Sequence, residues 1–185
     1  MKNTVVCISG TPGTGKSEIA KELENLLGAN VISVNSLLRK GYIICEWDVK
    51  RKTKVVNVKE AERAARKCMK MGINIIDSHY SHLMKCDLLV ILRTRPDILL
   101  KRLEKRRWNR AKIYENVLSE ILGEIFIEST GKKNIIEIDT SCRRPKEAVR
   151  IIKSSLNNHS MQMKYRPKIE WTIKYTKLLL KMGSV

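Results

Sequence analysis

The run GTPGTGKS at residues 10–17 carries the clearest chemistry in the sequence. It matches the pattern G-x-x-x-x-G-K-[ST], a loop that binds phosphate groups. Its glycines, Gly13 and Gly15 among them, let the backbone curl so that successive N–H groups point toward an anion. Lys16 can then reach the β- and γ-phosphates, and the Ser17 hydroxyl can coordinate Mg²⁺. The run therefore predicts a site for a magnesium-bound nucleoside triphosphate.

A second polar group, Asp77-Ser78-His79, follows the apolar run at residues 73–76. P-loop folds hold Mg²⁺ through its water shell with an acid at the end of a buried strand, which makes Asp77 a candidate for that role. A helix or turn cap is the alternative for Asp77. His79 is a candidate for orienting or deprotonating a water that attacks the γ-phosphate. A structural histidine is the alternative there, and His82 could instead occupy the catalytic place.

The segments on either side of the loop are those that a phosphate site requires. Residues 4–9 form a short apolar, β-branched run that predicts a strand. Residues 17–27 predict a helix with an apolar face made of Ile19, Ala20, Leu23, Leu26 and Leu27. A strand, this loop and a helix N-terminus follow one another in the order typical of a triphosphate site.

The rest of the chain alternates apolar runs with helical periodicity. We expect strands at residues 31–34, 73–76, 87–92 and 134–139, and helices at 58–71, from residue 96, at 111–128 and at 145–156. Asn35 or Ser36 could cap a short helix, whereas residues 41–57 show no clear period. The alternation predicts the α/β class, with a mostly parallel sheet covered on both faces.

Several basic segments allow more than one interpretation. Arg93-Thr94-Arg95 ends a predicted strand, at the edge where open α/β sheets bind ligands. The run from Lys101 to Arg107 could close over a triphosphate as a lid, or could be a solvated helix face. Residues 159–167 are interpreted as a linker.

The terminal segment, residues 168–185, predicts a helix with Trp171, Tyr175, Leu178, Leu179 and Met182 on one face and lysines on another. From Arg143 onward the chain holds eleven basic and two acidic residues, which is half of the net charge. This segment could pack on the domain, bind RNA or dock on a protein.

Composition limits the class of protein. The 185 residues suffice for one α/β domain with a real core. They include 37 basic and 19 acidic residues, a formal charge of +18 that would attract nucleic acid, an acidic partner or an anionic surface. No apolar run approaches the roughly 18 residues of a membrane span, and no membrane partner is expected. Five scattered cysteines without C-x-x-C spacing favour reduced thiols in a cytoplasmic protein.

Over residues 3–157 the chain resembles the atypical adenylate kinase family, which includes the nuclear coilin-interacting ATPase and the archaeal putative adenylate kinases. The resemblance lies in the phosphate loop, in Asp77-Ser78-His79 as that family's D-x-H motif, and in the segments 90–94, 104–106 and 112–121. The D-x-H form is the specific signal, because common adenylate kinases do not carry it.

The resemblance implies a P-loop NTPase fold of the adenylate-kinase-like type: a five-stranded parallel sheet with helices on both faces. It places a kinase domain at residues 1–157, with an NMP-binding insertion at about 33–56 and a lid at about 105–115, and leaves 158–185 as a basic C-terminal extension. By position, the residues implied to contact ATP are Gly13, Gly15, Lys16, Ser17, Glu18 and Arg106. Asp77 is implied to hold Mg²⁺ together with Ser17, and His79 to assist hydrolysis.

The same resemblance implies a function. Members are described as nucleoside monophosphate kinases and as ATPases, with ATP and Mg²⁺ as cofactors and AMP or another monophosphate as acceptor. They act late in small ribosomal subunit maturation and rRNA processing of the 16S type, through transient binding of a platform ribosomal protein. The alternatives are an ATPase assembly factor with little kinase activity and a small-molecule kinase of the same fold. The high positive charge suits an rRNA or pre-ribosome surface.

The chain departs from this family in the NMP-binding insertion. Where members usually carry acidic residues, this sequence has Arg39, Lys40, Lys50, Arg51, Lys52 and Lys54. Phosphorylation of AMP is therefore a weaker expectation than ATP hydrolysis.

Overall fold

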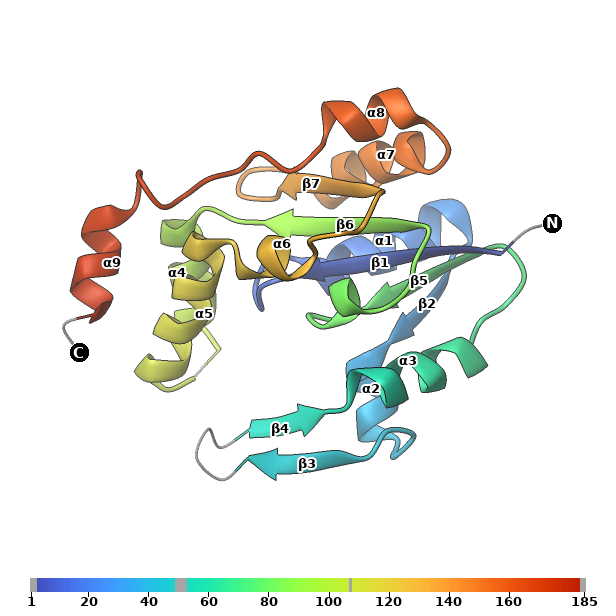
Figure 1. The fold of residues 1–185 in the computed structure, drawn as a ribbon, viewed down its shortest axis with the longest axis horizontal. Coiled ribbons are helices and arrows are strands. Elements are labelled where there is room, and N and C mark those ends of the chain that lie inside the picture. Colours follow the sequence, from blue (N-terminus) through green and yellow to red (C-terminus); the bar gives the residue numbers. More distant parts are fainter. Residues whose placement is uncertain (1–2, 49–52, 107, 184–185) are drawn as a thin grey trace.

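The computed structural model describes residues 3–48, 53–106 and 108–183. Its centre is a five-stranded parallel sheet in the order β2-β5-β1-β6-β7 (Figure 1). The strands are β1 (Thr4–Gly10), β2 (Asn30–Ser33), β5 (Ile73–Asp77), β6 (Leu88–Arg93) and β7 (Ile135–Asp139). The predicted α/β class and the five-stranded parallel sheet are confirmed.

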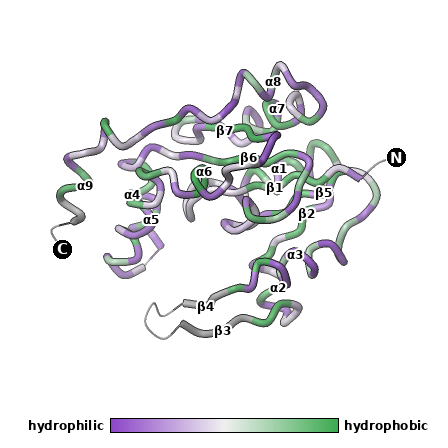
Figure 2. Tube along the Cα trace, in the orientation of Figure 1, coloured by the Kyte–Doolittle hydropathy of each residue, from purple (hydrophilic) through white to green (hydrophobic). Residues whose placement is uncertain are grey.

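Helices cover both faces of this sheet, as predicted. On one face α1 (Lys16–Leu27) and α7 (Pro145–Ser155) enclose a core that includes Ile8, Leu23 and Ile152. On the other face α2 (Val34–Arg39), α3 (Val58–Lys67) and the short helix η1 (Ser81–Leu83) enclose a second core. Figure 2 shows the hydrophobic colour along the central strands, which burial on both faces requires.

A third apolar cluster lies outside the sheet. It joins α4 (Pro96–Glu104) and α5 (Arg110–Leu122) to the C-terminal segment, which ends in α9 (Thr176–Gly183). Trp171 is buried in this cluster, and Tyr175, Leu178 and Leu179 pack against it. Packing on the domain, one of the interpretations of this segment, is thus confirmed. The helix starts at Thr176 instead of residue 168, and the side chain of Met182 lies outside the described residues.

The region 41–57, which has no clear period, contains a β-hairpin. Strands β3 (Cys45–Asp48) and β4 (Thr53–Val56) pair antiparallel, and Cys45 lies opposite Val56. Just before it, α2 starts at Val34 and its N-cap is Ser33, whose hydroxyl accepts the Ser36 N–H. The prediction of a cap at Asn35 or Ser36 was therefore wrong.

Three further boundaries differ from the prediction. Helix α3 ends at Lys67 instead of residue 71, and Gly72 then serves the turn into β5 with φ +100°. The helix expected at 111–128 breaks at Gly123, whose left-handed backbone caps α5 before α6 (Glu124–Glu128). The linker expected at 159–167 instead contains α8 (His159–Lys164), capped by the Asn158 side chain.

Parts of two predicted apolar faces are exposed. Leu26 of α1 and Leu118 and Leu122 of α5 face solvent, so only the remaining apolar residues of those helices reach a core. Within the described residues, no helix has the length and hydropathy of a membrane span.

Candidate functional site

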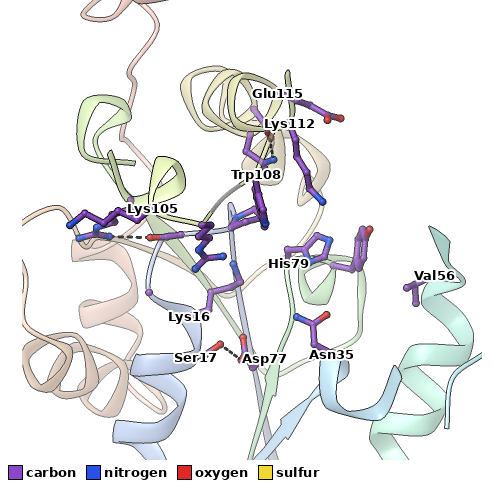
Figure 3. A pocket seen from close by; sticks show the side chains of 18 of the residues that line it. Lys16, Ser17, Asn35, Val56, Asp77, His79, Lys105, Trp108, Lys112 and Glu115 are labelled. Carbon is purple, nitrogen blue, oxygen red and sulfur yellow. Dashed lines mark hydrogen bonds between the residues drawn. The ribbon is translucent and has the colours of Figure 1, made fainter. Parts of the chain in front are cut away.

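A cleft of about 1990 Å³ lies at the carboxyl end of the parallel sheet. Figure 3 shows Lys105 and Val56 at its two ends, with Lys16, Ser17 and Asp77 between them. All eight residues predicted for the site line it: Gly13, Gly15, Lys16, Ser17, Glu18, Asp77, His79 and Arg106. The parallel register explains the convergence, because Ile8 pairs with both Asp77 and Val90, so β1, β5 and β6 end at one edge.

The phosphate loop between β1 and α1 depends on glycine at two close approaches. A Cβ on Gly10 would lie 2.6 Å from the carbonyl oxygen of Leu92, and one on Gly13 would lie 2.8 Å from the side chain of Leu99. Both glycines also have φ values in the range that L side chains rarely adopt, +147° and +98°. The loop is therefore packed directly against β6 and α4.

Lys16 lies folded over this loop. Its ammonium donates to the carbonyl oxygens of Gly10 at 2.6 Å and Thr11 at 3.1 Å. Burial, with the charge of Arg106 adding to it and those of Asp77 and Glu120 opposing it, lowers the pKa of Lys16 to about 8. A phosphate beside this ammonium would stabilise its charged form, which desolvation disfavours.

Ser17 and Asp77 form the candidate magnesium site. The Ser17 hydroxyl donates to Oδ2 of Asp77 at 2.9 Å. Burial raises the pKa of Asp77, while the Ser17 hydrogen bond and the Lys16 charge oppose that rise. A hydroxyl and a carboxylate are oxygen donors of the kind that Mg²⁺ prefers, and this ion usually takes few protein ligands beside water and substrate phosphates. The two residues therefore fit the metal.

His79 lines the cleft, whereas His82 does not. Burial lowers the pKa of His79 to about 4, and the charges of Lys16 and Lys112 add to the effect, so the imidazole is neutral at pH 7. His82 is buried: its Nδ1 is 3.0 Å from the Ser9 hydroxyl and its Nε2 is 2.7 Å from Glu128. Of the two histidines, only His79 is placed to meet a bound nucleotide.

The loop and helix after α4 bring cations over the cleft. Lys105, Arg106 and Lys112 line it, and Trp108 lies among them. The Lys112 ammonium is 4.6 Å and the Arg106 guanidinium 5.6 Å from the centre of the Trp108 ring, as in cation–π contacts. These residues have the placement expected of a lid, whereas Arg107 lies outside the described residues.

The basic residues that end β6 are structural. Arg93 is buried and paired with Glu120 and Glu137. Arg95 pairs with Asp97 outside the cleft. The expectation that this strand end supplies ligand contacts was therefore wrong for both arginines.

Sequence reasoning missed Asn35 as a lining residue and placed Arg102 only within a basic run, without its contact with the phosphate loop. Arg102 donates to the carbonyl oxygens of Gly13 and Thr140, both at 3.2 Å, and so fixes the rim of the phosphate loop. Nothing in the local sequence distinguishes Arg102 from its basic neighbours. Among the basic residues of the insertion, Arg39 lines the cleft, whereas Lys50, Arg51 and Lys52 and the side chain of Lys54 lie outside the described residues.

Comparison with known proteins identifies the family of the chain. A family model described as an AAA domain matches residues 6–123. The protein named "Putative adenylate kinase" of Pyrococcus furiosus is 34% identical over 185 residues, covering 97% of this chain and 99% of the relative. The protein of the same name from Methanocaldococcus jannaschii is 34% identical over 171 residues, with 92% and 94% covered.

Solved structures show the same fold at low sequence identity. A gluconokinase from Sinorhizobium meliloti superposes with a TM-score of 0.57 at 12% identity, over 89% of this chain and 98% of that chain. A deoxyadenosine kinase from M. mycoides with bound dATP gives 0.53 at 17% identity, over 84% and 100%. With its phosphate loop and D-x-H motif on one cleft and relatives matched over nearly its full length, the chain belongs to the family of archaeal putative adenylate kinases.

Proposed function

We propose that this protein is an ATP-dependent nucleoside monophosphate kinase with AMP as its acceptor. The observation that carries the proposal is the shape of the cleft: the phosphate-binding residues lie at its middle, with space on both sides (Figure 3). Its volume of about 1990 Å³ exceeds the roughly 300–1,000 Å³ of a site for one small ligand. A donor and an acceptor nucleotide can therefore meet at the phosphates. The names of the archaeal relatives support this assignment.

The residues have distinct roles in this proposal. The backbone of the loop and Lys16 bind the β- and γ-phosphates of ATP, and Arg106 stabilises the charge that develops on the transferred group. Ser17 and Asp77 hold Mg²⁺, which supplies charge neutralisation to the phosphate oxygens. Glu18, Asn35 and Arg39 also line the cleft. In this proposal Glu18 contacts ATP, and Asn35 and Arg39 contact the acceptor. Closure of the lid excludes water, which would otherwise compete with AMP.

A coupled assay tests this function. ATP is incubated with each labelled monophosphate and, in parallel, alone, and both inorganic phosphate and the diphosphate formed from the labelled acceptor are measured. We expect a diphosphate of the acceptor in the presence of AMP. Phosphate release at the same rate with and without AMP, and no acceptor diphosphate, would refute the kinase.

ATP hydrolysis is the second candidate activity, and the neutral imidazole of His79 in the cleft favours it. A ring nitrogen of this neutral imidazole can accept a hydrogen bond from a water at the γ-phosphate and so orient it for attack. We expect His79→Ala to slow hydrolysis about 100-fold, within the range of general base catalysis, while ATP affinity stays within a factor of about three. His159→Ala, at the exposed start of α8, is the matched control. Unchanged turnover of the His79 variant would remove this role.

We further propose that hydrolysis serves late maturation of the small ribosomal subunit and processing of 16S-type rRNA, with a platform ribosomal protein as transient partner. The family resemblance and the formal charge of +18 support this proposal. Immobilised protein should retain the small subunit or its platform protein in a nucleotide-dependent way. Retention that is the same with and without ATP, and the same for Lys16→Ala, would contradict control of this binding by the nucleotide.

A further inference from the structure

A buried hydrogen-bond network lies behind the phosphate loop. The Thr11 hydroxyl donates to Oε2 of Glu120 at 2.6 Å, and Oε1 of Glu120 accepts from Arg93 Nε at 2.7 Å and from the Thr94 N–H at 3.0 Å. Arg93 also donates to the Glu120 carbonyl at 2.7 Å and to Glu137 at 2.8 Å. Thr11, Arg93, Glu120 and Glu137 are each at most 5% exposed. The first turn of the loop is thus tied to α5, β6 and β7.

The same network continues into the C-terminal segment. Oε2 of Glu137 accepts the backbone N–H groups of Lys168 at 2.8 Å and Ile169 at 2.7 Å, and Arg93 donates to the Ile169 carbonyl at 3.3 Å. Two residues later Trp171 is buried against α4 and α5. None of the described residues 166–180 lines the cleft, and the hydrogen bonds of Glu137, Arg93 and Glu120 lead from this segment to Thr11 of the phosphate loop.

We propose that the C-terminal segment positions the phosphate loop through Glu137, Arg93 and Glu120, so that docking of residues 168–171 and binding of ATP are coupled. Glu120 is the positioning residue at the centre of this path. The inference rests on the proposed binding of ATP in the cleft.

The hydrogen bonds from Glu137 through Arg93 and Glu120 end at Thr11, next to the phosphate-binding Lys16. Lys16 donates to the carbonyl of Thr11, the residue whose hydroxyl Glu120 holds. Displacement of Thr11 therefore displaces an anchor of the lysine that grips the phosphates. Two carboxylates also share one guanidinium in a buried site, so removal of either acceptor leaves a buried group unpaired.

Hydrogen exchange of the unmodified protein gives the first test. Coupling between two sites is reciprocal, so saturating ATP with Mg²⁺ should slow exchange of the Lys168 and Ile169 amides by about tenfold. The amides of Met161 and Gln162 in α8 are the matched control, because they lie nearby in the chain but outside the network. Exchange at residues 168 and 169 that does not respond to ATP would overturn the proposal.

Two substitutions test the path from the other side. Glu120→Gln and Glu137→Gln should each weaken ATP binding about tenfold in calorimetry, whereas Glu170→Gln in the exposed part of the tail should not. The KM for AMP should stay unchanged, which a general loss of structure would not allow. Variants that fold and bind ATP as tightly as the unmodified protein would refute the path. Absence of ATP binding by the unmodified protein would instead refute the proposed function itself.

Discussion

Lys16 is the side chain whose chemistry the fold alters most directly. Its ammonium, on a half-buried side chain, donates to the carbonyl oxygens of its own loop, and desolvation lowers its pKa to about 8. Asp77 and Glu120 are the anionic groups that oppose this shift. The free protein therefore holds this proton weakly near neutral pH, and a bound triphosphate would hold it firmly.

This difference predicts proton uptake on ATP binding. Above pH 8 the free protein has lost the Lys16 proton, whereas the complex keeps it, so binding takes up about one proton and weakens up to tenfold per pH unit. Calorimetry at pH 9 in two buffers of different ionisation enthalpy measures the uptake directly. Lys16→Met is the control and should show no uptake; an unmodified protein that also shows none would contradict the prediction.

The site could be predicted from sequence where its chemistry is local. Residues 10–17 contain a loop, an ammonium and a hydroxyl in one continuous run, and Asp77 and His79 follow one strand directly. Glu120 could not be found this way, because its partner Thr11 lies 109 residues earlier and only the packing of α5 brings them together. His82 shows the same limit, because its partners, the buried Ser9 and the exposed Glu128, come from distant segments.

At the scale of elements, α5 connects the lid to the core. Its first turns carry Lys112 and Glu115 at the cleft, and its later turns carry Val117 and Ile121 into the third apolar cluster. The start of the helix is fixed by Asn109, whose side-chain oxygen accepts the Lys112 N–H at 2.7 Å. This cap decides where the lid ends and the helix begins.

Loss of this cap should destabilise the protein measurably. We expect Asn109→Ala to lower the free energy of unfolding by about 1 kcal/mol, because a helix N–H loses its partner, whereas Asn109→Ser should be nearly neutral. Urea unfolding measures both. Asn116→Ala, on the same helix but away from its start, is the control; an equal loss in that variant would show that the cap has no special role.

Element boundaries depended on which residues mark them. Pro96 and Pro145 start α4 and α7 as expected, because proline fits the first helical turn. Gly123 was hidden inside a long apolar periodicity, although its left-handed conformation ends α5. The hairpin of β3 and β4 could not be predicted from the sequence, because its strands show no apolar alternation and are recognised only by their antiparallel pairing.

At the scale of the whole molecule, the excess of positive charge gathers on outer helical faces. Arg143, Lys146, Arg150 and Lys153 recur every three or four residues along α7 and its start, and all four are exposed. The opposite side of this helix is buried in the first core. Such a stripe matches a polyanion better than a small substrate.

RNA binding should therefore depend on this stripe and on salt. We expect affinity for single-stranded RNA to fall steeply with salt, and Arg150→Gln with Lys153→Gln to reduce the log–log slope by about 1.4, or roughly 0.7 per contact. Filter binding at salt concentrations from about 50 to about 200 mM measures the slope. Lys59→Gln with Lys67→Gln, exposed on α3, is the control. Equal slopes for both pairs would show that the charge acts only in bulk.

The contact between Glu137 and the amides of residues 168 and 169 also has a consequence for the order in which the molecule is completed. During translation the phosphate loop, which ends at Ser17, is synthesised 151 residues before the first of those amides, that of Lys168. The sheet and its two cores can assemble on the nascent polypeptide, since none of their members comes after Tyr165. Under the coupling proposed above, a nascent chain that lacks residues 168–171 should hold ATP more loosely than a chain in which this segment has docked.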